Sequence, residues 1–270
     1  MHLTFENVDQ FCADVQCEED DPIIDLSRIT FFRPFSLVYL GMFLRYHNSN
    51  GKSFSVLPPI ATKARKYLSQ QQFWERFNFD PKTMVPADLT QFSNTTSLND
   101  IIDIEHRSYI GEDIAKQVFE ILRRKQVKIN IGLFSVMISE LIDNFEYHSQ
   151  SNLAVCAMQY YPNLNRVVFA VGDCGIGIKE SLISNPNNEH LKELSEHEIA
   201  LKSFEPLVTR MHEGGMGLTE VREGIIEMGG RLTCSTGIGY VIISQKEEAS
   251  GNMAHYLPGV QMELSVPEVA

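Results

Sequence analysis

Short apolar runs alternate along the chain with longer segments whose apolar residues recur every three or four positions. In the N-terminal part this pattern predicts the order strand, helix, strand, helix, which is typical of a small α/β unit. Pro34 fits the first turn of the first helix, and Gly51 lies where a glycine that ends a helix belongs. We therefore expect an α/β domain over residues 1–85. Its strands and helices are expected at 22–27, 34–50, 53–59 and 62–77.

A polar stretch separates this unit from the rest of the chain. Residues 80–100 are rich in Pro, Ser, Thr, Asn and Asp and show little periodicity, so we expect a linker at 86–104. Over 105–270 the pattern predicts a two-layer α/β sandwich, with helices on one side of a mixed, mostly antiparallel sheet. Helices are expected at 110–126, 132–148, 196–204 and 217–228. Strands are expected at 154–161, 166–173, 231–236, 239–244 and 260–266, the first two as a hairpin.

Composition and charge narrow the class of protein. The chain has 270 residues, of which 43% are hydrophobic, without an apolar run long enough for a membrane span or a secretory leader. The net charge of −12 disfavours binding to nucleic acid or to an anionic membrane. The five cysteines form no CxxC pair, and Cys12 and Cys17 lack the histidines of a metal site. We therefore expect a cytoplasmic protein with reduced thiols.

One predicted helix carries an unusual row of polar side chains. Glu140, Asn144 and His148 are spaced four residues apart, so they lie on one side of the helix 132–148. An apolar stripe runs beside them, which would anchor the helix in a core. The row would either face a binding site along the border of that core or simply face solvent.

Two glycine-rich motifs follow this helix. In "VGDCGIGI", Asp173 comes directly after an apolar strand, where its carboxylate could bind the exocyclic amine of a base or form a β-turn. In "HEGGMGLTEV", glycines precede the helix 217–228, which suits a phosphate cradle or a flexible loop. A third motif fails, since "GKS" at 51–53 has Tyr46 where a P-loop needs glycine.

The chain resembles the GHKL (Bergerat-fold) ATPase superfamily in four features and in their order along the sequence. These are the polar row, the Asp-x-Gly-x-Gly motif, the polar segment 178–213 and the glycine-rich start of the helix that follows. The resemblance covers residues 105–268, and the anti-sigma-factor serine kinases are the most similar members. It implies binding of ATP or ADP with Mg²⁺, and a lid at 178–213. It also implies that Glu140 acts as general base, that Asn144 binds Mg²⁺ and that Asp173 binds the adenine amino group. The other implied nucleotide contacts are Gly175, Gly177, Arg210, Gly215, Gly217 and Leu218.

The chain departs from this family at its last strand. Many bacterial relatives have Gly-Thr there, with the threonine fixing adenine through water, whereas this chain has Gly259-Val260. The hydroxyl of Thr233, Ser235 or Thr236 could take its place. For Arg210, contact with the γ-phosphate and simple solvation are equally compatible with the sequence.

The N-terminal segment "IDLSRITFFRPFSLVYLGMF" resembles STAS domains, the fold of anti-anti-sigma factors. Those domains carry a phosphoacceptor serine just before their first long helix. Here that place is occupied by Arg33 and Pro34, and Ser36 lies inside the helix. The resemblance therefore implies a docking module that has lost its phosphorylation switch, and an unrelated α/β unit is the alternative.

These observations predict a cytosolic regulatory protein that binds Mg-ATP and either hydrolyses it or phosphorylates a serine or threonine of a signalling partner. A nucleotide-gated interaction module with negligible turnover is the alternative, and a homodimer stays open. A sensor histidine kinase is disfavoured because His106 lacks the context of a phosphoacceptor. A metal enzyme is disfavoured because His190 and His197 do not share a helix face.

Overall fold

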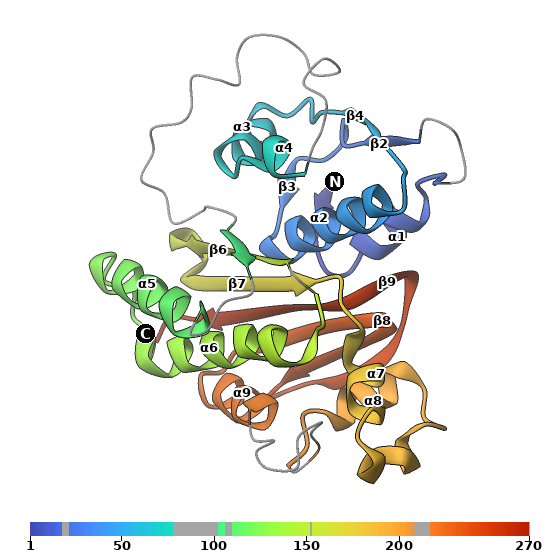
Figure 1. The fold of residues 1–270 in the computed structure, drawn as a ribbon. Helices are drawn as coiled ribbons and strands as arrows, with labels where there is room; N and C mark the ends of the chain where they lie inside the picture. The colour runs from blue at the N-terminus through green and yellow to red at the C-terminus, as the bar shows by residue number, and fades with distance from the viewer. Residues whose placement is uncertain are drawn as a thin grey trace.

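The computed structural model describes residues 1–17, 22–77, 102–105, 110–151, 153–206, 208 and 217–269. A five-stranded sheet forms the centre of the molecule, with helices on both of its faces (Figure 1). The described helices include none with the length and apolar character of a membrane span. The expected linker at 86–104 lies almost entirely outside the described residues.

The central sheet has the strand order β5-β6-β7-β9-β8, and every one of its pairings is antiparallel. The strands are β5 (Ile102–Glu105), β6 (Leu153–Tyr161), β7 (Arg166–Asp173), β8 (Arg231–Ser244) and β9 (Glu248–Pro267). The hairpin β6–β7 is confirmed, and it turns through the 3-10 helix η3 (Pro162–Leu164). The prediction of two strands at 231–236 and 239–244 was wrong. They form the single strand β8, because a bulge at Gly237 lets one strand continue along β9.

Three helices cover one face of this sheet: α5 (Ile110–Arg124), α6 (Ile131–His148) and α9 (Gly217–Glu227) (Figure 1). All three agree with the sequence prediction. Asn130 begins α6, and its side chain accepts a hydrogen bond from the Leu133 N–H (3.1 Å). The apolar stripe of α6 is buried as expected, which fixes the direction of its polar row. The buried residues of α6 are Phe134, Met137, Ile138, Leu141, Ile142 and Phe145.

The described part of the expected lid is helical and packs against the end of the sheet. It contains α7 (Gly177–Ile183), the 3-10 helix η4 (Pro186–Leu191) and α8 (Glu196–Lys202). The predicted helix at 196–204 is confirmed as α8, whereas α7 was not predicted. Glu196 joins α8 to the bulge of β8, since its carboxylate accepts a hydrogen bond from the Ile238 N–H (2.6 Å).

The described residues of the N-terminal part form two short parallel strand pairs and four helices. The expected strands and the first expected helix are confirmed, but the helix predicted at 62–77 is interrupted. Gln72 adopts a left-handed backbone conformation (φ +51°) there, which separates α3 from α4. The STAS resemblance stays a prediction. The elements are β1 (His2–Leu3), α1 (Val8–Ala13), β2 (Ile23–Asp25), β3 (Phe31–Phe32), α2 (Pro34–Ser49), β4 (Ser55–Leu57), α3 (Thr62–Gln70) and α4 (Phe73–Arg76).

Helix α2 covers the face of the sheet opposite to α6, so the sheet lies between two helical layers (Figure 1). Every residue from Pro34 to Leu44 is buried. The same core includes Val155, Ala157 and Ala170 from the sheet. The N-terminal part and the sheet therefore share one hydrophobic core.

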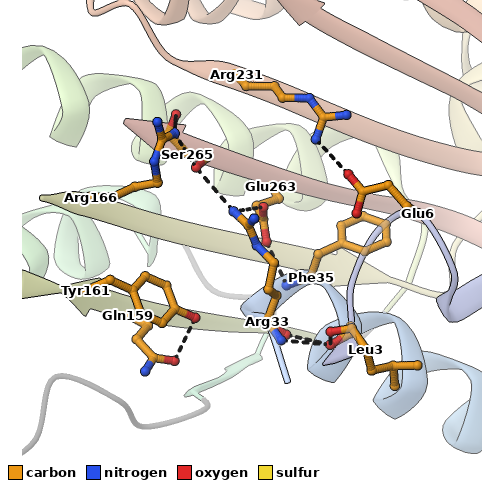
Figure 2. Close-up of polar contacts among 11 residues, drawn as sticks. Leu3, Glu6, Arg33, Phe35, Gln159, Tyr161, Arg166, Arg231, Glu263 and Ser265 are labelled. Carbon is orange, nitrogen blue, oxygen red and sulfur yellow. Dashed lines mark hydrogen bonds and ion pairs between the residues drawn. The ribbon is translucent and has the colours of Figure 1, made fainter. Parts of the chain in front are cut away.

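A partly buried polar cluster fixes the start of α2 to the sheet (Figure 2). Glu263 of β9 accepts a hydrogen bond from the Phe35 N–H (3.0 Å) and forms an ion pair with Arg33 (3.2 Å). Burial raises the pKa of Glu263, and the Arg33 guanidinium opposes this shift. A carboxylate at this position satisfies a free N–H group and the dipole of the helix N-terminus. The sheet thereby supplies the cap of α2.

Candidate functional site

A cavity of about 350 Å³ lies between α6, the end of β7, α7 and the first turn of α9. One wall comes from the polar side of α6, and the opposite wall comes from β7, β9 and α7. The cavity is thus built at the place where the two glycine-rich motifs approach the polar helix. Its main side chains are Glu140, Asn144, His148, Asp173, Ile178, Ser181, Leu182, Ser203, Leu218, Val260 and Met262.

The polar row of α6 faces this cavity over two helical turns. Glu140, Asn144 and His148 all line it. The Asn144 side-chain amide donates a hydrogen bond to the Glu140 backbone carbonyl (2.6 Å). This bond occupies the nitrogen of the amide, so Oδ1 is the atom that can bind a cation. Oxygen is the ligand type that Mg²⁺ requires.

Asp173 lies at the other end of the cavity, where β7 ends. Its side chain is buried and accepts a hydrogen bond from the Gly175 N–H (2.6 Å). Burial raises the pKa of Asp173 to about 7, against backbone hydrogen bonds from Gly175 and Val260 that favour the charged form. The carboxylate therefore changes its charge near neutral pH.

The turn after Asp173 depends on its glycines. Gly177 has φ +77°, which disfavours other residues. A side chain at Gly175 would collide with the Ser149 carbonyl. This turn directs α7 across the cavity, and the Thr236 hydroxyl accepts a hydrogen bond from the Ile178 N–H there (3.0 Å).

Polar side chains of β8 and β9 support the Asp173 backbone from behind. Gln261 donates to the Asp173 carbonyl (2.9 Å) and accepts from the Ser235 hydroxyl (2.7 Å). Ser235 and Thr236 therefore have structural partners, and neither they nor Thr233 line the cavity. The hydroxyl-bearing residues that line it are Tyr147, Ser149, Ser181 and Ser203.

Glu140 lies at the opposite end of the cavity from Asp173, where α9 begins. Burial raises the pKa of Glu140, and the nearby carboxylates of Glu220 and Asp143 raise it further. A Cβ atom at Gly217 would lie 2.5 Å from the Glu140 Oε2 atom. The missing side chain lets the first turn of α9 approach the carboxylate closely.

The structure brings most of the predicted site residues together. Gly175 contacts the carboxylate of Asp173, although it does not line the cavity. Arg210 and Gly215 lie outside the described residues, as does His106. His197 instead contacts the Asn252 side chain (3.1 Å), and the described ranges contain no group of three side chains suited to a metal ion. The predicted residues that line the cavity are Glu140, Asn144, Asp173, Gly177, Gly217 and Leu218.

Sequence reasoning missed several lining residues. Ser181 and Ser203 belong to segments without any recognisable motif. The apolar wall could have been found from strand alternation, because Val171 and Asp173 must share one face of β7. By the same alternation, Val260 and Met262 share one face of β9.

Comparison with known proteins agrees with this geometry. Residues 131–259 match the family described as "Histidine kinase-, DNA gyrase B-, and HSP90-like ATPase". No curated protein matches the chain. One matching solved structure is "Mycobacterial sensor histidine kinase MprB", with 16% sequence identity and a TM-score of 0.34 over 63% of this chain and 97% of that chain. Residues 131–259 are therefore similar to the ATPase domains of this family.

Proposed function

We propose that the cavity binds Mg-ATP, with the base at Asp173 and the phosphates between α6 and α9. The observation that carries this proposal is the arrangement of charge along one cavity. A buried carboxylate stands at one end, and an amide and a second carboxylate line the other. The apolar side chains of Ile178, Val260 and Met262 also line the cavity, which suits the flat face of a base.

At the base end, the ionised Asp173 would accept a hydrogen bond from an exocyclic amino group. Its hydrogen bonds from Gly175 and Val260 hold the carboxylate in position. Ser181 and Ser203 would supply the hydroxyl contacts that the missing threonine provides in relatives. Val260 replaces that threonine with an apolar surface.

At the phosphate end, Asn144 Oδ1 would bind the Mg²⁺ ion, which neutralises charge on the phosphates. Glu140 would take the proton from a water molecule or from a partner hydroxyl. The oxygen then bonds to the γ-phosphorus while the bond to the bridging β–γ oxygen breaks, and ADP leaves with the electron pair. The raised pKa of Glu140 suits a group that must accept a proton.

A second function, nucleotide-gated interaction with other proteins, is favoured by contacts behind the base site. Gly172 is so close to α2 that a Cβ atom on it would lie 2.6 Å from Val38 Cγ1. The thiol of Cys174 donates a hydrogen bond to the Met42 carbonyl (3.3 Å). Both residues flank Asp173, so a nucleotide that moves this strand end would also press on the N-terminal part.

We place either function in a cytosolic regulatory protein with a protein partner. All five cysteines are free thiols, which suits a reducing compartment.

Calorimetric titration with Mg-ADP and Mg-ATP tests the binding proposal. Asp173→Asn should weaken nucleotide binding about a hundredfold, because the single acceptor oxygen of the amide is taken by the Gly175 N–H and its NH2 group then faces the amino group of the base. Unchanged affinity in this variant would contradict the assignment. Glu140→Gln should keep nucleotide affinity but lower turnover about a hundredfold or more. Turnover that is absent from the wild-type chain, with binding intact, would support the gated interaction module instead.

A further inference from the structure

A second hollow lies on the outer side of the helical layer, between α6 and α9. Its volume is about 220 Å³. We call it the α6–α9 groove. Its lining residues are Leu133, Val136, Met137, Glu140, Glu220, Val221, Glu223, Gly224 and Glu227.

The floor of the α6–α9 groove is apolar. Gly224 lets the two helices come together, since a Cβ atom on it would lie 2.8 Å from Met137 Sδ. Val136 remains 51% exposed beside this contact, although it is a large apolar residue of a helix packed in the core. An aliphatic side chain from another molecule would bury Val136 and remove it from water.

The rim of the groove is acidic. Glu220, Glu223 and Glu227 follow one another at spacings of three and four residues, so they project from the same side of α9. All three are exposed. Arg222 of the same helix forms an ion pair with Glu248, so its charge is directed to another side. The rim therefore presents several carboxylates around an apolar floor.

Glu140 lines both the α6–α9 groove and the nucleotide cavity. It is the only residue that the two hollows share among those described. A segment lying in the groove would therefore come next to the carboxylate that we propose as general base. The phosphate end of the cavity lies on the other side of that carboxylate.

From this arrangement we infer that the α6–α9 groove docks a segment of a partner protein that carries an aliphatic residue between Lys or Arg residues and presents a Ser or Thr hydroxyl to Glu140. The aliphatic residue fits the floor at Val136, and the cations fit the rim of α9. The inference rests on the proposed function, because it names the nucleophile for the same site. It makes the chain a kinase of basic segments rather than an ATPase alone.

A labelled synthetic peptide with Leu and Ser between flanking Lys and Arg residues, added to the full chain, tests docking by fluorescence anisotropy. Glu223→Gln combined with Glu227→Gln should weaken peptide binding about fivefold to tenfold, since two rim charges are lost. Raising the salt concentration should weaken binding to the wild-type chain. Glu112→Gln combined with Glu120→Gln, on the exposed side of α5, removes the same charge away from the groove and should leave binding unchanged.

Three outcomes would overturn the docking proposal. The Glu223→Gln, Glu227→Gln variant binds the peptide as tightly as the wild-type chain, a peptide with Glu in place of Lys and Arg binds equally well, or no peptide binds at all. Transfer of radiolabelled phosphate to the Ser peptide, and none to its Ala version, tests the hydroxyl. ATP hydrolysis without such transfer would overturn that part alone. Calorimetry with Mg-ADP separates the two proposals. Failed nucleotide binding with intact peptide binding refutes the Mg-ATP site and leaves the groove standing.

Discussion

Helices α2 and α6 lie on opposite faces of the same sheet, yet their sequences are built differently. In α2, eleven successive residues from Pro34 to Leu44 are buried, so this helix is apolar on every side. In α6, burial follows a stripe, and Glu140, Asn144 and His148 remain beside it. A helix covered on all sides can hold few polar residues, whereas a helix that borders a cavity can hold a row of them.

The carboxylates associated with the two helices also have different surroundings. Beside α2, the Glu263 carboxylate has an ion pair and a backbone N–H as partners. On α6 itself, the Glu140 carboxylate lies near Glu220 and Asp143, which are like charges. The first arrangement satisfies a charge and holds two parts of the molecule together. The second leaves a carboxylate ready to accept a proton, which is typical of functional sites.

Truncation of a buried side chain in α2 should give the largest effect on stability. Leu40 is fully buried, so Leu40→Ala should lower the free energy of unfolding by about 3 kcal/mol through lost burial and a cavity. Urea unfolding measures this change. The control is Val136→Ala in α6, which should stay within about 0.5 kcal/mol because Val136 is half exposed. Similar losses in both variants would break the contrast between the helices.

Gly172→Ala tests whether the close contact between α2 and β7 influences the site as well as stability. The added Cβ atom would lie 2.6 Å from Val38 Cγ1, so overpacking should cost about 2 kcal/mol of stability. Because Asp173 is the next residue, nucleotide affinity should fall as well. Combining it with Val38→Ala removes the contact with Val38 but leaves Gln261 Cγ 2.9 Å from the new Cβ atom, so it should restore both properties in part. A stability loss without any change in affinity would show that α2 does not influence the site.

A change of pH should give the smallest effect, and its sign differs between stability and binding. The pKa of Asp173 is raised to about 7, and the base contact needs the charged form. Nucleotide affinity should therefore fall about tenfold per unit as pH drops below 7. Without nucleotide, the same raised pKa favours the folded state at low pH, and this contribution is lost as pH rises through 7. The Asp173→Asn variant should lack both dependences.

Local sequence patterns predicted much of the site because its main residues lie on regular elements. Helical spacing was enough to place Glu140 and Asn144 together, and the strand before Asp173 was recognisable from its apolar run. The partners of Asp173 were not predictable, because Gln261 lies 88 residues away and reaches it only through the pairing of β7 with β9. The break at Gln72 was missed for another reason, since no glycine or proline marks it.

The packing of α2 against the sheet could not be predicted from the local sequence pattern either. Its uniformly apolar sequence indicates a buried helix but does not say which surface buries it. The contact with Gly172 depends on the whole arrangement of the sheet. Long-range packing of this kind leaves no periodic signal in either segment.

The capping of α2 by Glu263 has a practical consequence for the expression of the C-terminal part on its own. A fragment that begins after residue 101 would retain β9 but lose Arg33 and the Phe35 N–H group. Its sheet would then present Val155, Ala157 and Ala170 to water, with an orphaned carboxylate among them. Such a surface invites self-association. The two halves should therefore be expressed as one polypeptide, or the N-terminal half should be supplied alongside in trans.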